Sequence, residues 1–157
     1  LEITTKAIAA MFKITEAHWS VERATHAALA RLKQDGYHLC IISNASNTED
    51  LNNLIDQSGL RCYFDQIIIS AEEKIRKPHP KIFEIALRKM KANPEESIMV
   101  GDTLTADILG AQKAGMRAVW ITRRANRPEN NRMKRVIAPD FSINRLSKLA
   151  GILASIK

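Results

Sequence analysis

The chain has 157 residues, of which 45% are hydrophobic, and its 24 Lys and Arg outnumber its 17 Asp and Glu to give a net charge of +7. This composition is globular and excludes a chain that is disordered throughout, and the length favours one domain. Two cysteines, Cys40 and Cys62, are too few for a disulfide scaffold or a zinc site, and apolar runs such as 39–42 are too short to span a bilayer.

Apolar runs and amphipathic stretches alternate along the chain from residue 22 onward. The predicted elements are a helix at 22–34, a strand at 37–42, a helix at 48–57, a strand at 64–70, a helix at 80–90, a strand at 97–100, a helix at 104–114, a strand at 118–121 and a terminal helix at 146–156. The strands are apolar without alternation, which is typical of strands buried on both faces. The pattern therefore predicts an α/β fold, with a parallel sheet flanked by helices.

Polar side chains follow three of the predicted strands. In chain order they are Ser43 and Asn44, then Lys77, then Asp102 and Asp107. Ligands of open parallel sheets bind at the carboxyl ends of the strands, so we expect these side chains to meet at one edge.

The residue types in this set suit phosphoryl chemistry. The Ser43 hydroxyl and the Lys77 ammonium can hold an anion, while the carboxylates of Asp102 and Asp107 can hold a hard cation such as Mg²⁺. Gly101 allows close approach of the backbone just before the carboxylates. An anion clamp beside a cation site is the equipment that phosphoryl transfer uses.

Each motif also has a purely structural interpretation. Ser43 and Asn44 could form a turn, and the Lys-Pro-His-Pro segment at 77–80 could be an exposed loop that opens a helix. Asp102 or Thr103 could cap the helix that follows them. The order of the three motifs, each placed after an apolar strand, favours the functional interpretation over these separate ones.

These motifs resemble those of the haloacid dehalogenase (HAD) superfamily of hydrolases, which are mostly phosphatases. The segment Ile-Ile-Ser-Asn at 41–44 resembles the second family motif, 77–80 resembles the third, and 100–103 together with Asp107 resembles the fourth. The similarity runs from about Trp19 to Arg123. It implies a Rossmann-like sheet flanked by helices, which is the HAD core.

The resemblance also implies a role for each site residue. Ser43 and Asn44 would bind the phosphate of the substrate, and Lys77 would be the catalytic lysine that steadies it. Asp102 and Asp107 would serve Mg²⁺ directly or through water. The reaction implied is attack of an aspartate on phosphorus, followed by hydrolysis of the aspartyl-phosphate, with a small phosphorylated metabolite as substrate.

The chain departs from the family at its amino-terminal end. The first family motif, Asp-x-Asp after an initial strand, occurs nowhere in the sequence, and the first aspartate is Asp35. Residues 1–18, with apolar side chains near helical spacing, resemble the tail of a helical cap. We therefore expect a core domain at 19–157 whose first strand is absent from the chain, and a chain that is inactive alone.

An absent first strand would leave a gap in the sheet. It would lie between the strand that ends at Ser43 and the strand that ends at Gly101. We expect an upstream segment to fill this gap, with a strand from a second chain or direct pairing of the two neighbours as the alternatives, because unpartnered strand edges are costly.

The remaining candidates have weaker chemistry. The four histidines show no metal-ligand spacing, so we expect them to pack or face solvent, with His79 near the ligand as the exception. The basic stretch at 123–135 could bind a polyanion, but it contains no aromatic residue to stack on bases. We expect a solvated loop there and no nucleic-acid partner.

The sequence therefore predicts a cytoplasmic, Mg²⁺-dependent phosphatase of the HAD type. Two alternatives remain open. One is a non-catalytic binding or regulatory module of the same fold that never had the first motif, and the other is a polyanion-binding protein.

Overall fold

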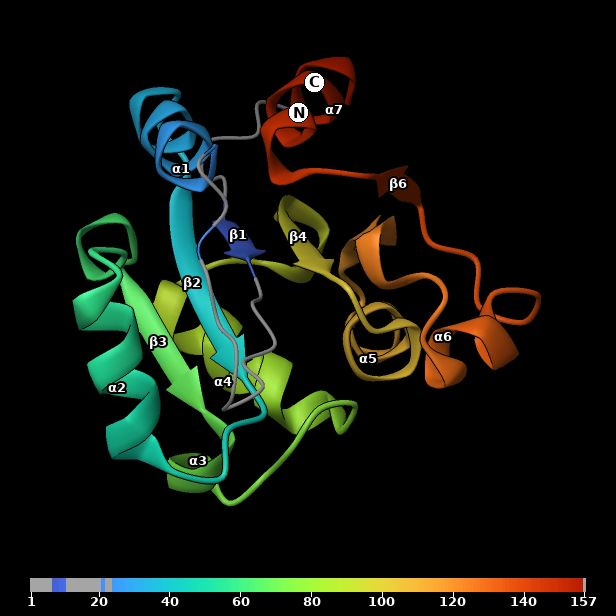
Figure 1. The fold of residues 1–157 in the computed structure, drawn as a ribbon, viewed down its shortest axis with the longest axis horizontal. Helices are drawn as coiled ribbons and strands as arrows, with labels where there is room; N and C mark the ends of the chain where they lie inside the picture. The colour runs from blue at the N-terminus through green and yellow to red at the C-terminus, as the bar shows by residue number, and fades with distance from the viewer. Residues whose placement is uncertain (1–6, 11–20, 22–23, 157) are drawn as a thin grey trace.

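The fold is built on a parallel sheet with the strand order β3-β2-β1-β4-β5-β6 (Figure 1). The structure is a computed structural model that describes residues 7–10, 21 and 24–156. Within these residues the strands are β1 (Ala7–Ala10), β2 (His38–Ser43), β3 (Gln66–Ile69), β4 (Ser97–Gly101), β5 (Arg117–Ile121) and β6 (Phe141–Ile143). All the pairings are parallel, so every strand ends at the same edge of the sheet.

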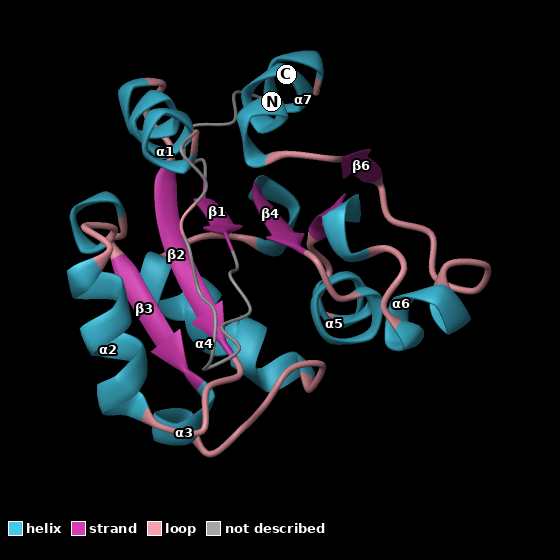
Figure 2. Ribbon diagram, viewed as in Figure 1, coloured by secondary structure: helices cyan, strands magenta, loops and turns pink. Residues whose placement is uncertain are grey.

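Helices cover both faces of this sheet (Figure 2). In the described chain they are α1 (Thr25–Gln34), α2 (Thr48–Gln57), α3 (Ser70–Glu73), α4 (Pro80–Met90), α5 (Gly110–Lys113), α6 (Pro128–Met133) and α7 (Leu149–Ser155). A π-helical turn, η3 (Leu104–Leu109), leads into α5. None of these helices has the length and apolarity that a membrane crossing needs.

Successive strand residues pack alternately into two separate hydrophobic cores, one on each face of the sheet. Leu39 and Ile41 of β2 pack with the helices α1, α2 and α7, whereas Cys40 and Ile42 pack with α4, η3 and α5. The same alternation continues through β4 and β5. Burial of successive side chains on opposite faces explains why these strands are continuous apolar runs in the sequence.

The predicted fold class is confirmed, and the strands β2, β3, β4 and β5 lie where the apolar runs predict them. The helix predicted at 48–57 is α2, and the Asn47 side chain caps it by accepting hydrogen bonds from the amides of Glu49 and Asp50. Gly36 and Gly59 follow α1 and α2 with positive φ values of 81° and 66°, which end both helices in the left-handed region.

The place expected for the absent first strand is filled by residues of this chain rather than by an upstream segment, while the first family motif, Asp-x-Asp, does not occur in the sequence. Residues 7–10 form β1, and this strand pairs with β2 on one side and β4 on the other, at the place where a gap was expected. The physical reason is that the facing edges of β2 and β4 carry backbone groups that need partners. A short segment with neither charge nor proline can supply them. Apart from β1, the cap remnant expected at 1–18 lies outside the described residues.

Two other segments differ from prediction. The stretch at 123–135 is not a loop throughout, because it contains α6, and Asn130 within it is only 1% exposed. The helix predicted at 104–114 begins as the π-helical turn η3 and only then becomes α5. Apolar spacing over so few residues does not distinguish a π turn from an α turn.

Candidate active site

Three loops meet at the carboxyl edge of the sheet, beyond the ends of β2, β3 and β4. They carry the residues predicted for the site, namely Ser43, Asn44, Lys77, Asp102 and Asp107. The Lys77 ammonium lies 3.1 Å from Oδ1 of Asp107 and donates a hydrogen bond of 2.6 Å to the Ile42 carbonyl at the end of β2. The structure thus brings the lysine, the second aspartate and the end of β2 together, as the strand order predicts.

Asn44 fixes the Lys77 segment to the end of β2. Its side-chain amide donates to the Lys77 carbonyl at 3.0 Å, and its Oδ1 accepts from the Lys77 amide at 2.8 Å. Ser43, the residue before it, is 3% exposed at the last position of β2. The side chain of Asn44 therefore positions the lysine, and its expected contact with phosphate stays a prediction, as does that of Ser43.

The helix that follows Lys77 is held at its start. His79 caps α4 by accepting a hydrogen bond of 3.2 Å from the Lys81 amide, so its ring has a structural task in this structure. Gly110 packs tightly against the same segment, because a Cβ atom there would lie 3.1 Å from Cα of Pro78. This close packing fixes the backbone next to the lysine.

Asp107 projects from η3, directly after β4. Its Oδ2 accepts hydrogen bonds from the backbone amides of Asp102 and Thr103 at 3.1 and 2.9 Å. The carboxylate can reach these amides because Gly101 has no side chain, since a Cβ atom there would lie only 2.4 Å from Cβ of Asp107. The glycine before the aspartates is thus required by the second carboxylate, and π turns of this kind are frequent at functional sites.

Lys77 and Asp107 form an ion pair that is completely buried, with 0% exposure of both side chains. Burial raises the pKa of Asp107, while the Lys77 ammonium and the Thr103 amide oppose that shift. The Oδ1 atom of Asp107 accepts no hydrogen bond within the described structure although it is buried. A buried oxygen with spare lone pairs can accept a further ligand.

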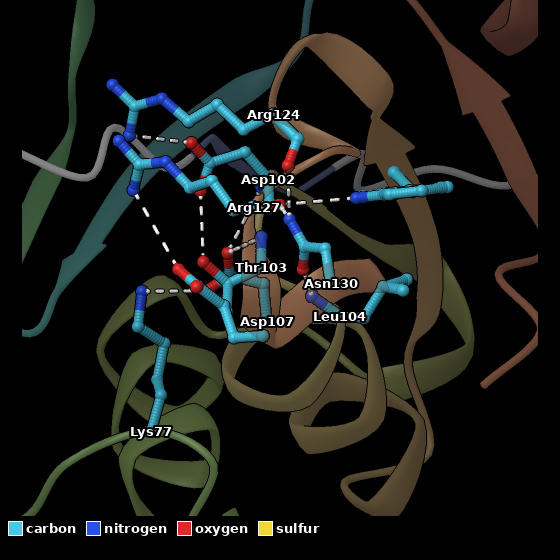
Figure 3. Close-up of polar contacts among 10 residues, drawn as sticks. Lys77, Asp102, Thr103, Leu104, Asp107, Arg124, Arg127 and Asn130 are labelled. Atoms are coloured by element: carbon cyan, nitrogen blue, oxygen red, sulfur yellow. Dashed lines mark hydrogen bonds and ion pairs between the residues drawn. The ribbon is translucent and has the colours of Figure 1, made fainter. Parts of the chain in front are cut away.

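Asp102 is engaged from the other side of the site, by the segment after β5. Nη1 of Arg124 lies 2.9 Å from its Oδ2, and the Thr103 hydroxyl donates to its Oδ1 at 3.1 Å. Figure 3 shows Lys77 and Arg124 approaching the two carboxylates from opposite sides. Each aspartate therefore has its own cationic neighbour.

Asn130 of α6 connects the loops after β4 and β5. Its Nδ2 donates to the carbonyls of Asp102 and Arg124 at 2.8 and 2.9 Å, and its Oδ1 accepts from the Leu104 amide at 2.9 Å (Figure 3). The Trp120 indole N–H donates to the same Asp102 carbonyl at 3.2 Å. The backbone of the first aspartate is thus held by two side chains from outside its own loop.

The oxygen atoms of the two aspartates can be compared with the ligands that a hard cation requires. Mg²⁺ is held by one or two carboxylates and keeps several waters, so Asp102 and Asp107 provide enough protein ligands. Oδ1 of Asp107 supports this fit, because within the described structure it accepts no hydrogen bond and faces the Lys77 ammonium at 3.1 Å. No cluster of three or more His, Cys, Asp and Glu side chains occurs among the described residues, so a site built wholly from protein ligands is not found there.

Three further residues hold the predicted ones in place, and the sequence does not predict them. Arg124, Asn130 and Trp120 all contact Asp102, but they lie in segments without a recognised motif. The basic stretch contains three asparagines, Asn126, Asn130 and Asn131, and nothing in the sequence indicates which of them is buried. Cys40 of β2 is buried in the core, and this burial raises the pKa of its thiol to about 12.

Comparison with known proteins identifies what the chain is similar to. Residues 4–121 match the family described as haloacid dehalogenase-like hydrolase. The glyceraldehyde 3-phosphate phosphatase of Methanothermobacter thermautotrophicus is 36% identical over 129 residues, which are 82% of this chain and 57% of the relative. The phosphoserine phosphatase of Thermus thermophilus is 35% identical over 123 residues, 78% of this chain and 47% of the relative.

Solved structures agree with these matches. The crystal structure of a HAD phosphatase from Thermococcus onnurineus superposes with a TM-score of 0.73 at 34% identity, covering 85% of this chain and 58% of the other. The chain spans between 38% and 57% of the length of the curated relatives it matches.

Proposed function

The chain belongs to the haloacid dehalogenase-like hydrolase family, and from this premise we propose that it carries the phosphate-binding and cation-binding part of a phosphatase for a small phosphorylated metabolite. The relatives named as phosphatases of glyceraldehyde 3-phosphate and of phosphoserine support this substrate class. A cytoplasmic location and the absence of a nucleic-acid partner remain untested predictions of the sequence.

One observation carries the proposal. The Lys77 ammonium bridges the end of β2 and the carboxylate of Asp107, with distances of 2.6 Å to the Ile42 carbonyl and 3.1 Å to Oδ1. A buried cation at this position lies between the proposed phosphate site after β2 and the proposed cation site after β4. Such a bridge balances negative charge on both sides of a transferring phosphoryl group.

The other residues have matching roles in the proposal. Ser43 would donate a hydrogen bond to a phosphate oxygen, and Asn44 would keep the lysine segment in register with it. Asp102 and Asp107 would hold Mg²⁺, and a bound Mg²⁺ would neutralise charge on the phosphate oxygens. Lys77 would orient the phosphoryl group rather than exchange protons with it.

The attacking group of the family reaction has no counterpart among the 157 residues, because Asp-x-Asp does not occur in them. We therefore propose that this chain binds phosphate in the presence of Mg²⁺ but does not hydrolyse p-nitrophenyl phosphate at a rate above background. Removal of a nucleophile eliminates most of an enzyme's rate enhancement, since positioning and polarisation alone remain.

The test combines binding and turnover in one set of variants. Titration of inorganic phosphate into the chain with Mg²⁺, followed by calorimetry, is expected to give weak binding that Ser43→Ala reduces by at least about tenfold, the size of a hydrogen bond to a charged group. Ser155→Ala, an exposed serine on α7, is the matched control and should leave the affinity unchanged.

Turnover tests the proposed inactivity of the chain. No hydrolysis is expected from the wild-type chain. Hydrolysis above background by the purified chain would show that a nucleophile lies among the 157 residues and would overturn this part of the proposal. Equal phosphate affinity for the wild type and Ser43→Ala would remove the phosphate site from the end of β2.

A second function is supported by the same missing motif. A HAD-like module without a nucleophile could bind a phosphorylated ligand and regulate a partner. An intact mass of the native protein, together with its amino-terminal sequence, separates the two. A native mass near the 17.6 kDa of this chain would favour the binding module, and a larger protein with Asp-x-Asp upstream would favour the phosphatase.

A further inference from the structure

Every oxygen of the two carboxylates in the proposed cation site faces a donor or a cation from the chain itself. Oδ2 of Asp107 accepts two backbone amides, and its Oδ1 lies 3.1 Å from the Lys77 ammonium. Asp102 has the Thr103 hydroxyl at Oδ1 and the Arg124 guanidinium at Oδ2. A divalent cation held by Oδ2 of Asp102 would therefore compete with the Arg124 guanidinium for that oxygen.

The two cationic neighbours differ in how easily they can leave. The Lys77 side chain is 0% exposed and donates to the carbonyl of Ile42, so its withdrawal would leave buried groups without compensation. The Arg124 side chain is 31% exposed and its partner Asp102 is 13% exposed. A guanidinium that leaves a partly exposed pair moves into water, where it is well solvated.

The backbone around Arg124 is held independently of its side chain. Asn130 donates to the Arg124 carbonyl and to the Asp102 carbonyl, so both backbones stay in place when the guanidinium moves. The backbone of this loop is therefore held without the ion pair to Asp102. This is the arrangement expected of a counter-ion that can be exchanged.

We propose that Arg124 is a displaceable internal counter-ion, which occupies Oδ2 of Asp102 until a divalent cation replaces it. The inference rests on the proposed function, because it takes Asp102 as a cation ligand. Its consequence is that the chain lowers its own cation affinity. The guanidinium and the cation compete for one carboxylate oxygen, and they also repel each other.

Trp120 provides a direct readout of this exchange. Its indole donates to the Asp102 carbonyl at 3.2 Å, so the emission of Trp120 should respond when a cation binds at Asp102. The sequence contains one other tryptophan, Trp19. Substitution of Trp19→Phe leaves Trp120 as the single reporter.

The experiment is a titration of Mg²⁺ and, separately, Mn²⁺ into the Trp19→Phe chain at constant ionic strength, followed by fluorescence and by calorimetry. In this background Arg124→Gln is expected to bind the cation about fivefold more tightly, the size of a partly exposed ion pair. Arg124→Lys keeps the charge and should lie between the wild type and Arg124→Gln.

Arg127→Gln is the matched control. Its side chain is 32% exposed, close to the value for Arg124, but its ionic partner is Glu129 at 4.0 Å rather than Asp102. The same loss of charge at this position should change the affinity by less than about twofold. Equal increases in cation affinity from Arg127→Gln and Arg124→Gln would show that the effect comes from net charge alone, and this would overturn the proposal.

The remaining outcomes separate this inference from the proposed function. In one outcome the wild type binds the cation and Asp102→Asn does not, but Arg124→Gln binds it no more tightly than the wild type. This outcome overturns the counter-ion role and leaves the cation site intact. Absence of millimolar binding in both the wild type and Arg124→Gln overturns the cation site itself and the inference with it.

Discussion

Two aspartates accept backbone amides at opposite edges of the same sheet, and only one of them is buried. Asp107 at the carboxyl edge accepts the amides of Asp102 and Thr103, faces Lys77 and is 0% exposed. Asp65 at the amino edge accepts the Leu39 amide at 2.8 Å, pairs with Lys33 at 2.9 Å and has a side chain 35% exposed.

A carboxylate, a lysine and a backbone amide therefore contribute differently to stability at the two edges of the sheet. At the amino edge, water solvates both charges, so the pair adds a little stability and holds the start of β2 against the start of β3. At the carboxyl edge, both side chains are 0% exposed, so bulk solvent does not screen either charge and the loss of one leaves the other uncompensated. The comparison shows that the same residue types form a solvated ion pair at one edge and a fully buried ion pair at the other.

The largest expected effect comes from removal of the lysine at each edge. Lys77→Met should destabilise the chain by about 3–5 kcal/mol, because it leaves the buried Asp107 carboxylate without its cationic partner. Lys33→Met, the matched change at the amino edge, should cost less than about 1 kcal/mol. Urea unfolding followed by circular dichroism measures both.

The double variant Lys77→Met with Asp107→Leu serves as the control for that effect. It removes both buried charges and should recover most of the lost stability. A cost below about 1 kcal/mol for Lys77→Met alone would contradict the buried pair.

Next in size is the effect of a methyl group at Gly101. Gly101→Ala would place its Cβ 2.4 Å from Cβ of Asp107, and we expect a loss of about 1–3 kcal/mol from this overpacking. Gly151→Ala in α7 meets no atom within 4 Å and should instead stabilise the chain by up to about 1 kcal/mol. Opposite shifts of the thermal midpoint would verify the pair of predictions, and equal shifts would contradict the tight contact.

Loss of Asn130 tests how far the buried edge depends on the segment after β5. Asn130→Ala removes three hydrogen bonds and should cost about 1–3 kcal/mol, since the Leu104 amide loses its side-chain acceptor. Asn93→Ala, which removes an exposed amide that bonds to Glu96, should cost less than about 0.5 kcal/mol. Similar costs for the two asparagines would argue against a bridging role for the buried one.

The smallest effect concerns pH at the amino edge. Partial burial would raise the pKa of Asp65, but the hydrogen bonds from Lys33 and from the Leu39 amide outweigh it and lower the pKa. A carboxyl group with a lowered pKa in the folded state stabilises the fold above its unfolded pKa of about 3.9, and this stability is lost as the pH falls through the lower, folded value.

Asp65→Asn should therefore cost less than about 1 kcal/mol at pH 7, because the side chain is well exposed to solvent. The difference from the wild type should shrink as the pH falls below about 4. Urea unfolding at several pH values between 3 and 7 measures it. A difference that grows at low pH would reverse the sign and contradict the lowered pKa.

The sequence predicts the carboxyl edge well where chemistry and order coincide. Ser43, Lys77 and Asp102 each follow an apolar strand, and parallel strands end at one edge, so their convergence follows from topology. Contacts that depend on three-dimensional packing could not be predicted in this way. Asn130 reaches Asp102 across 28 residues, and no spacing along the chain indicates that contact.

The amino-terminal strand β1 could not be predicted from the sequence for a different reason. Residues 7–10 contain three alanines, which have little β-propensity, beside a single isoleucine, and their apolar neighbours fall near helical spacing. The place of β1 in the sheet comes from the backbone groups that β2 and β4 present on either side. β6 has only three residues, too few for a periodicity to be recognised.

The double hydrogen bond between Asn44 and Lys77 also has a consequence for motion. An asparagine side chain that both donates to and accepts from one residue's backbone imitates the pairing of a neighbouring strand, so the lysine segment is continuous with β2 although it belongs to no strand. The amide proton of Lys77 should then exchange with solvent deuterium at the rate of the sheet interior rather than that of a surface loop. Local unfolding of the Lys77 segment would then require unfolding of the sheet itself. The geometry around Lys77 should therefore persist for as long as the domain is folded.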